Sequence, residues 1–493
     1  MAVEIIEVKQ NKKELARYVK FGIDLYEENP YFVPPLIFDE INTLIPAKNP
    51  AFEVCEAKCW LAMRDGKPVG RITAIINNVV NERSGKKDMR FGFTDFIDDA
   101  EVVDALFATA MRWGKERGME YIVGPMGFTD MDHEGMLTDG YEEAGTMATI
   151  YNYPYYVQHI ERMGFEKDAN WVEYRIKVPE TIPDQLARVG AIVEKKLKLR
   201  VVKYTSGKKI KNDYGVALFE LINEAYDQLY GYSPLTKKQI NYYIDQYLPI
   251  LRLENVCVIV DENDRLVGVG ISIPSMTKAL QKSRGRIFPF GWYHLLKGMY
   301  GKNDTVDLLL VAVRPELQGK GVNALLFTDL IPVFAKNGYK WAESNLELAD
   351  NESVQQQWKF FERRLHRKRS VFRKQIPENI KKMAITPFIR PFFLHRAKVA
   401  HEKALKAEMT QRCELAWMMD RARHTLIGEK YGFAGIDSYE EFRRRVPLAE
   451  YSDIRELVMR MVNGEKDILW KGVTRNFAQS SGCLLYTSDA ADD

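Results

Sequence analysis

Hydrophobic and polar positions along the first three quarters of the chain follow one order of elements twice. Each copy begins with an apolar strand pattern and an amphipathic helix pattern, at residues 4–8 and 12–26 and again at 200–204 and 214–230. Each continues with two apolar runs around a short turn, a further strand, a long helix with apolar residues three and four apart, and a closing strand. This order predicts two α+β domains of similar fold.

The two hairpins give the offset between the copies. They span residues 60–76 and 257–273, and a Val-Gly pair in each lies 198 residues from its counterpart. Gly66 suits the first turn because a tight hairpin turn requires positive φ. The long helices end near Gly118 and Gly338, which are 220 residues apart. The second copy is therefore predicted to carry an insertion of 22 residues between its hairpin and its helix.

A glycine-containing turn follows the apolar strand 306–313 and precedes a helix. Gly319 and Gly321 lie directly before that helix, where backbone N–H groups have no partner and no side chain obstructs them. Lys320 adds a mobile positive charge. The turn lacks the Gly-Lys-Ser/Thr ending of a P-loop and the third spaced glycine of a Rossmann turn. We expect it to bind a phosphate or pyrophosphate, with a plain strand-ending turn as the alternative.

At this turn the chain resembles the GNAT superfamily of acyl-CoA-dependent N-acyltransferases. The residues that match the family's pyrophosphate loop are Gln318, Gly319, Lys320, Gly321, Val322 and Asn323, the last in place of a small residue. The resemblance implies a mixed central sheet flanked by helices, with acyl-CoA as co-substrate. It also implies oxyanion N–H groups near Val311 to Val313 and a cofactor contact from Asn351. Where the family often has a tyrosine that protonates the leaving thiolate, this chain has Trp358, whose indole is a very weak acid.

Amide formation from a thioester also needs a group that accepts the amine proton. Glu343, Asn345 and Glu347 alternate along the strand after the long helix, so we expect their side chains to share one face. Either carboxylate could be the base, and the alternative is that both are solvated surface residues. His294 and His366 are further candidates.

The first copy has an acidic segment, residues 97–102, at the position of the phosphate loop, and it would repel phosphates. We therefore expect residues 1–185 to form a GNAT-like domain without the phosphate loop and residues 186–376 to form the acyl-CoA domain. The paired arrangement resembles tandem GNAT proteins that include proposed bacterial ceramide synthases, in the segments 29–36, 151–158 and 342–351. That resemblance implies transfer of a fatty acyl group to a long-chain amine.

Two basic segments suggest further contacts. Residues 276–302 interleave lysine and arginine with aromatic residues, which is typical of peripheral binding to an anionic membrane, and the alternative is a flap packed on its own domain. Residues 363–374 carry seven basic residues and are predicted to form the closing strand of the second domain. The adjacent residues Asp130, Asp132, His133 and Glu134 suit a turn better than spaced metal ligands, so no metal site is predicted.

The last quarter of the chain has a different pattern. Residues 403–433 are predicted to be helical, and the sequence from Thr425 onward resembles the N-terminus of the auxin-conjugating (Gretchen Hagen) family of acyl-adenylating amide synthetases. Ser480, Ser481 and Gly482 would begin that family's nucleotide loop, and the resemblance stops there. We therefore expect residues 377–482 to be a mainly helical, truncated segment. Residues 483–493 resemble a translated sequencing adapter.

Composition narrows the functional classes. The 493 residues carry a net charge of only +3, so the chain lacks the strong overall positive charge that is typical of nucleic-acid-binding proteins. Five cysteines in so long a chain are no disulfide framework, and no apolar run approaches the ~20 residues of a membrane span. We expect a cytoplasmic N-acyltransferase that uses acyl-CoA and an amine, with peripheral contact to the inner membrane as an option. The alternatives are a non-catalytic acyl-CoA or lipid-binding protein and a fragment of an ATP-dependent amide synthetase.

Overall fold

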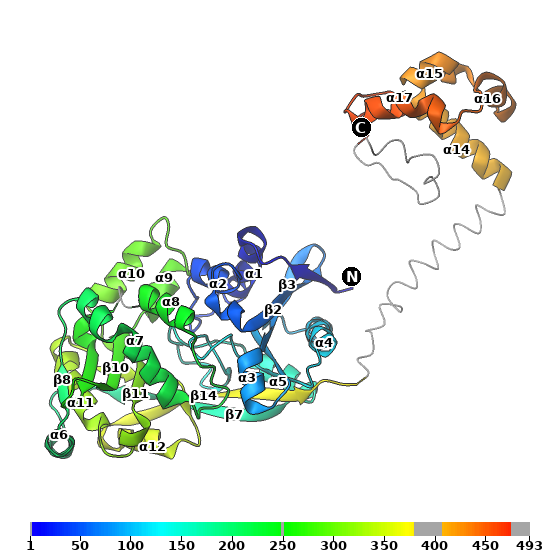
Figure 1. The fold of residues 1–493 in the computed structure, drawn as a ribbon. Helices are drawn as coiled ribbons and strands as arrows, with labels where there is room; N and C mark the ends of the chain where they lie inside the picture. The colour runs from blue at the N-terminus through cyan, green and yellow to red at the C-terminus, as the bar shows by residue number, and fades with distance from the viewer. Residues whose placement is uncertain (1, 248–250, 379–406, 475–493) are drawn as a thin grey trace. The chain divides into compact units, whose positions relative to one another are not determined.

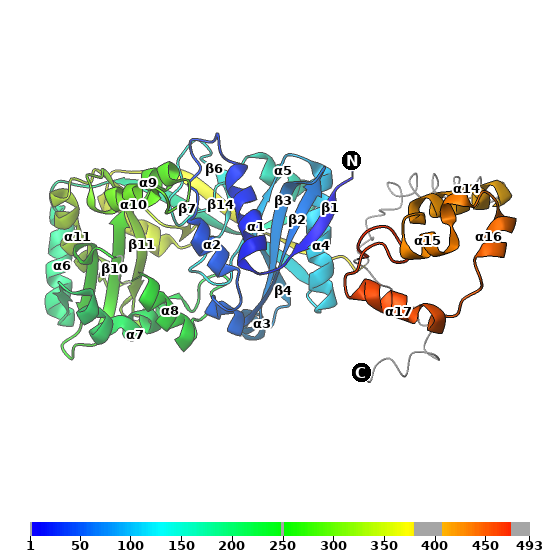
Figure 2. The ribbon, with the colours of Figure 1, turned by 90° about the horizontal axis from the view of Figure 1, so that it is seen from above.

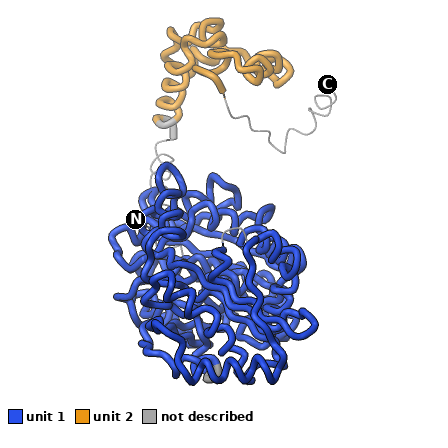
Figure 3. Tube along the Cα trace, turned by 90° about the vertical axis from the view of Figure 1, so that its left-hand side faces the viewer, with its two compact units in different colours: residues 1–383 blue, residues 384–493 orange. Residues whose placement is uncertain are grey.

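The structure, a computed structural model, describes residues 2–247, 251–378 and 407–474. The chain divides into two compact units, residues 1–383 and residues 384–493 (Figure 3). Within the described residues, no helix combines the length and the apolar character that crossing a membrane requires. The two units are described separately below.

The first half of unit 1 follows the predicted order of elements (Figure 1). Its strands are β1 (Glu4–Val8), β2 (Cys55–Arg64), β3 (Lys67–Asn77), β4 (Asp88–Phe96), β5 (Tyr121–Gly124), β6 (Met136–Asp139) and β7 (Glu166–Lys177). Its helices are α1 (Lys12–Asp24), α2 (Ile37–Thr43), α3 (Asn78–Ser84), α4 (Ala100–Glu116) and α5 (Tyr155–Arg162). The hairpin turn has Gly66 at φ 74°, as its position predicts. Cys55 and Cys59 are buried residues of β2 with free thiols.

The second half repeats this order and contains the predicted insertion. Its strands are β8 (Arg200–Val202), β9 (Val256–Val260), β10 (Leu266–Pro274), β11 (Thr305–Val313), β12 (Trp341–Glu343), β13 (Glu347–Leu348) and β14 (Arg363–Gln375). Its helices are α6 (Asp184–Leu197), α7 (Gly207–Tyr226), α8 (Lys237–Tyr247), α9 (Thr277–Ser283), α10 (Gly291–Tyr300), α11 (Asn323–Lys336) and α12 (Glu352–Gln355). The insertion forms α9 and α10.

One mixed sheet runs through both halves, with helices on its two faces (Figure 2). In the second half, α6 and α11 cover one face, and α7 and α8 cover the other. Most neighbouring strands are antiparallel, whereas β4 with β5 and β11 with β12 are parallel. This architecture confirms the predicted α+β class with a mixed central sheet flanked by helices. The boundary expected between residues 185 and 186 stays a prediction.

The two halves exchange their last strands. The strand order is β1-β2-β3-β4-β5-β14-β7-β12-β11-β10-β9-β8. Strand β14, the last of the second half, pairs antiparallel with β5 of the first half, and β7 of the first half pairs antiparallel with β12. The predicted basic strand thus exists as β14, but it pairs with strands of the first half rather than with β12.

The first half fills the place where the second half has its glycine turn. The Asp99 side chain accepts hydrogen bonds from the N–H groups of Glu101 and Val102 and so caps α4, which occupies donors that a phosphate would need. Beneath it, Arg71 is buried between Glu40 and Asp95. That this half lacks a phosphate loop stays a prediction.

Unit 2 is helical over its described residues, as its sequence predicts. Its helices are α14 (Ala407–Ala422), α15 (Leu426–Tyr431), α16 (Tyr439–Arg445) and α17 (Tyr451–Val462). A small core contains Met419, Phe433 and Ile436. The expected start of a nucleotide loop at residues 480–482 and the adapter-like residues 483–493 lie outside the described residues.

Candidate functional site

Strands β11 and β12 begin side by side and then separate. They pair over three positions, from Thr305 opposite Trp341 to Asp307 opposite Glu343. Beyond this point the register between β10 and β11 shifts, so that Leu309 is an extra residue in β11. The Asn345 side chain donates a hydrogen bond to the Leu309 carbonyl at 2.9 Å and holds the bulge in place. Backbone pairing between the two strands thus ends at Asp307, and we call the unpaired stretch beyond it the opening between β11 and β12.

The glycine turn follows β11 directly. Gly319 and Gly321 have φ values of 70° and 82°, in the left-handed region that glycine tolerates best. Among the described residues, none accepts a hydrogen bond from the N–H groups of Gly319, Gly321, Val322 or Asn323. A Cβ added at Gly319 would meet no atom within 4 Å, so the turn is open. The structure therefore has the unobstructed N–H groups at a helix start that the sequence predicts.

Neighbouring side chains fix the shape of this turn. The Gln318 side chain donates a hydrogen bond to the Val313 carbonyl at 3.0 Å. The Asn323 side chain donates to Gln357 at 3.1 Å, so the departure from a small residue at this position does not cap the free N–H groups. On the other side, Val189 and Val193 of α6 lie within 3.3 Å of the place where a Gly321 side chain would be. Lys320 is exposed.

An apolar cavity of about 50 Å³ lies beside the opening. Leu308, Val311 and Ala342 line it from β11 and β12, and Leu326 of α11 and Trp358 close it. Tyr226 of α7 donates a hydrogen bond to the Val311 carbonyl at 2.8 Å. The cavity connects the strand opening with the helix whose N-terminus carries the glycine turn.

Glu347 and Trp358 form a buried pair, of which Trp358 lines this cavity. The Trp358 indole Nε1 donates a hydrogen bond to Glu347 Oε1 at 2.7 Å. No described residue donates a well-formed hydrogen bond to the other oxygen, Oε2, which is also buried. Burial raises the pKa of Glu347 to about 7, and the hydrogen bond from Trp358 opposes part of that rise. At neutral pH the group is therefore partly protonated.

Glu343 lies on the opposite face of the sheet, so the predicted shared face with Glu347 is wrong. Its Oε2 lies 2.9 Å from His366 Nε2 and 3.3 Å from Arg367, which also contacts Glu173. The reason is an irregular ladder: Glu343 pairs with Arg175 and Glu347 with Val172, so four residues on one strand match three on β7. An extra residue reverses the alternation of side chains.

Asp307 is a candidate that the sequence reasoning missed. It lies in β11 at the last position that pairs with β12, and its side chain is almost completely buried. Its carboxylate oxygens have no hydrogen bond of standard geometry to a described residue, but the Ser275 side chain and the Met276 N–H contact the group and lower its pKa against the effect of burial. Burial, with the negative charge of Glu343 as a second cause, raises the pKa of Asp307 to about 7. The signal was a single acidic residue inside an otherwise apolar strand.

The other predicted candidates lie in separate places. The Asn351 side chain accepts a hydrogen bond from the Val354 N–H at 3.3 Å and caps α12. His366 is buried beside Glu343, and His294 lies on α10. Asp132 accepts hydrogen bonds from two N–H groups of its own turn, as its turn-like pattern suggests. Among the described residues, no group of three or more His, Cys, Asp or Glu side chains could hold a metal ion.

Comparisons with known proteins agree with the resemblances found in the sequence. Residues 396–484 match the family model described as the GH3 family N-terminal domain. The chain is 29% identical over 350 residues to Protein YghO of Escherichia coli, and this alignment covers 70% of the chain and 88% of that protein. It is 27% identical over 303 residues to the bacterial ceramide synthase of Caulobacter vibrioides, with 60% of this chain and 76% of that protein covered.

Among solved structures, one similar chain is a tandem GNAT protein from the clavulanic acid biosynthesis pathway. It has a TM-score of 0.47 and 13% sequence identity, and the alignment covers 76% of this chain and 99% of that one. The sequence matches confirm that unit 1 resembles a bacterial ceramide synthase and that the C-terminal region resembles the Gretchen Hagen family.

Proposed function

We propose that unit 1 transfers an acyl group from acyl-CoA to an amine, at the opening between β11 and β12. The observation that carries this proposal is the conjunction of that opening with the free N–H groups of the glycine turn. Acyl-CoA needs an apolar slot for its acyl chain and, at a fixed distance from that slot, a site for the diphosphate of its coenzyme A part. The cavity of about 50 Å³ beside Leu308 would hold the first part of the acyl chain, and the start of α11 would bind the diphosphate.

The diphosphate of coenzyme A would bind at the N-terminus of α11. The N–H groups of Gly319, Gly321, Val322 and Asn323 can donate to its oxygens, and the helix dipole favours negative charge there. Lys320 adds an exposed positive charge, and Gln318 keeps the turn attached to Val313. Asn351 would act through the position of α12, which it caps.

The thioester carbonyl would lie next to β11. N–H groups of this strand between Val311 and Val313, which no longer pair with β12, would donate to the oxyanion as the tetrahedral intermediate forms. Tyr226 fixes the Val311 carbonyl and so the orientation of this peptide segment. The bulge at Leu309, to which Asn345 donates a hydrogen bond, would set the direction of the strand beyond it.

Glu347 would supply the proton that the departing thiolate needs. The indole of Trp358 is too weak an acid for this role, but it holds a carboxyl group whose pKa is about 7. A carboxylic acid that is partly protonated at neutral pH can donate its proton as the C–S bond breaks. Trp358 is then a positioning residue, and Glu347 takes the role that the GNAT resemblance gives to a tyrosine.

Asp307 would accept the proton of the attacking amine. Asp307 is the last residue of β11 that pairs with β12, and its buried carboxyl group, which lies near Glu343 and Ser275, has a pKa of about 7. The amine nitrogen forms the new C–N bond, and its proton passes to Asp307, directly or through water. Glu343 suits this role less well because it already forms an ion pair with Arg367.

The acceptor that we propose is a long-chain amine. The support is the similarity to the bacterial ceramide synthase, since ceramide contains an amide between a fatty acyl group and a long-chain amine. For unit 2, the GH3 match keeps a fragment of an acyl-adenylating amide synthetase as the alternative reading, and its nucleotide-loop residues lie outside the described part.

Thiol release from acyl-CoA tests the proposal. The purified chain is mixed with acyl-CoA of several chain lengths and with long-chain or short amines, and free thiol and amide product are measured. We expect amine-dependent thiol release that is greatest with a long-chain amine. Binding of acyl-CoA without amine-dependent release would favour the non-catalytic alternative, and amide formation that requires ATP would assign the activity to unit 2.

A further inference from the structure

The insertion of the second half, residues 276–302, forms a folded arm on the surface of unit 1. It contains α9 and α10, and its inner side packs on the domain through Met276, Leu280, Leu295 and Met299. The Gln281 side chain donates hydrogen bonds to the Pro30 and Phe32 carbonyls of the first half, at 2.8 and 3.1 Å. The arm is thus fastened to both halves, and its outer side keeps a defined shape.

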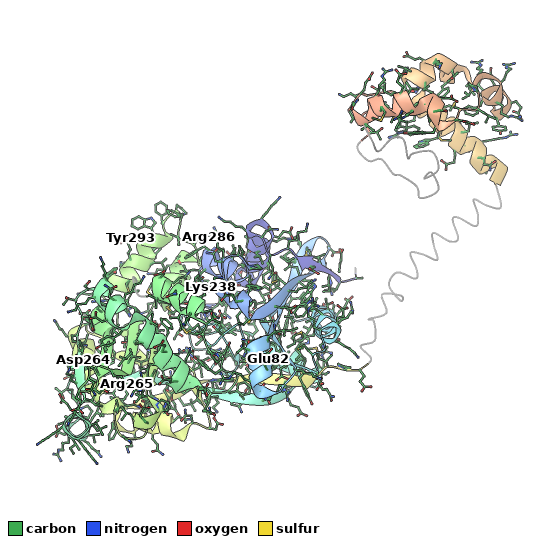
Figure 4. All side chains as sticks on the ribbon, in the orientation of Figure 1. Glu82, Lys238, Asp264, Arg265, Arg286 and Tyr293 are labelled. Atoms are coloured by element: carbon green, nitrogen blue, oxygen red, sulfur yellow. The ribbon has the colours of Figure 1, made fainter. Side chains whose placement is uncertain are left out.

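The outer side of the arm is apolar. Six of the eleven exposed large hydrophobic side chains described in residues 2–378 lie here, with exposed fractions of 77% for Phe288, 72% for Phe290, 46% for Trp292, 52% for Tyr293, 51% for Leu296 and 66% for Tyr300. Figure 4 shows Tyr293 and neighbouring rings projecting from the surface. On α10 the exposed and the packed residues alternate at helical spacing, so the helix is amphipathic with its second apolar face uncovered. Apolar clusters of this kind mark sites of contact.

The charge of the arm is entirely positive. It contains Lys278, Lys282, Arg284, Arg286, Lys297 and Lys302 and no Asp or Glu. Among the described residues, only Lys278 and Arg284 of these six have an ion-pair partner, Asp304 and Glu27. Four cations therefore surround exposed rings without a counter-charge. A surface of this composition complements a negatively charged partner that also has an apolar interior.

A groove of about 310 Å³ lies beside the arm. Arg284 and Arg286 line it from the arm, and Lys20 and Asn29 line it from the first half. Lys20 and Arg284 are paired with acidic residues, whereas Arg286 has no ion-pair partner among the described residues. Asp24 and Glu27 also line the groove as the partners of Lys20 and Arg284, so Arg286 supplies its positive charge without a described counter-charge.

We propose that residues 276–302 dock the protein on the surface of an anionic lipid bilayer. The exposed rings enter the boundary between headgroups and acyl chains, where aromatic side chains are favoured. Arg286 and the unpaired lysines contact lipid phosphates. The inference goes beyond the acyl-transfer proposal and stands on different residues, because none of the arm's exposed side chains belongs to the opening between β11 and β12.

Vesicle flotation with the full chain tests this inference. The probes are phosphatidylcholine vesicles and vesicles that also contain phosphatidylglycerol. We expect binding to the anionic vesicles that weakens as salt increases. The double variant Phe288→Ser/Phe290→Ser should lower the partition coefficient at least about tenfold, whereas the control Ile192→Ser, which changes a side chain of α6 with 62% exposure, should leave it unchanged.

A second pair of variants separates charge from apolar contact. Arg286→Gln/Lys297→Gln should reduce binding to anionic vesicles and its salt dependence, and Lys208→Gln/Lys209→Gln on α7 is the matched control. Absent or equal binding to the two vesicle types, or the same binding by all variants, would overturn the inference. A dimer in solution that disappears in Phe288→Ser/Phe290→Ser would also overturn it, in favour of a second copy as the occupant.

Failure of this inference can be distinguished from failure of the acyl-transfer proposal. The arm variants should keep the wild-type rate of thiol release with a short, water-soluble amine in the absence of vesicles. A loss of that rate would mean that the arm belongs to the reaction centre rather than to a membrane contact. Thiol release and flotation are measured on the same preparation, so each proposal has its own readout.

Discussion

Replacing Trp358 by phenylalanine tests the proposed acid most directly. The substitution removes the 2.7 Å hydrogen bond to Glu347 Oε1 and keeps an aromatic ring against Phe327 and Phe361. A hydrogen bond to a carboxylate stabilises its charged form by ~1.5–3 kcal/mol. At 1.36 kcal/mol for each unit, its loss should raise the pKa of Glu347 by about 1–2 units from its present value of about 7.

This shift should be visible in the pH dependence of the rate. If protonated Glu347 donates to the thiolate, the rate falls as the pH rises through the pKa of Glu347, and in Trp358→Phe this fall should move upward by about 1–2 pH units. The assay is kcat and kcat/KM for thiol release between about pH 5 and 10. Glu347→Gln should remove this limb and most of the activity.

A matched control is Trp113→Phe in the first half. Trp113 is also buried, but no described residue accepts a hydrogen bond from its indole nitrogen. This variant should keep the wild-type pH profile. If Trp358→Phe is folded and its high-pH limb coincides with that of the wild type, Glu347 is not the group that titrates, and the reasoning about the acid is refuted.

Three further substitutions test the rest of the site. Asp307→Asn should lower kcat by about 10²–10⁴-fold. The folded-state pKa of about 7 exceeds the ordinary value of 3.8, so ionisation of Asp307 destabilises the native state increasingly between these two pH values. The variant's gain in denaturation midpoint should therefore grow from about pH 4 to pH 7 and then level off, and a gain that does not change with pH would contradict the assignment. Gly319→Ala should raise the KM for acyl-CoA at least about tenfold, since its Cβ would stand among the free N–H groups. The control Gly66→Ala, at a similar φ in the β2–β3 turn, should show only the backbone strain. If the two variants have the same KM for acyl-CoA, phosphate binding at the glycine turn is contradicted. Glu343→Gln should reduce the free energy of unfolding by ~3–5 kcal/mol because it breaks the buried ion pair with Arg367. If the variant is instead as stable as the wild type but releases no thiol, Glu343 takes part in catalysis.

Local patterns in the sequence were sufficient for the elements and for the turn. Helical and strand spacing predicted both hairpins, α4 and α11, because each depends on residues close together in the chain. The turn at Gly319 was predicted because a backbone position with positive φ favours glycine, and the apolar pattern of the following helix is visible in the sequence. The exchange of β7 and β14 was not predicted, because strand partners are chosen through contacts between residues far apart in sequence.

The site was predicted only in part for physical reasons of the same kind. The faces of Glu343 and Glu347 depend on one extra residue in the ladder with β7, and simple alternation does not reveal it. Ser344 shows how this arises: its side chain accepts a hydrogen bond from the Tyr174 N–H, so a hydroxyl takes the place of a backbone acceptor. Asp307 was overlooked since a single acidic residue scarcely alters the apolar pattern of its strand.

The placement of β7 makes the second half depend on a strand of the first half. The strand that supports β12 and β13, and with them Glu343 and Glu347, is encoded before residue 178. Ile176 of the same strand lines the apolar cavity. The first half therefore supplies part of the wall of the proposed active site, and a chain that lacked this half would also lack the strand that positions Glu343 and Glu347.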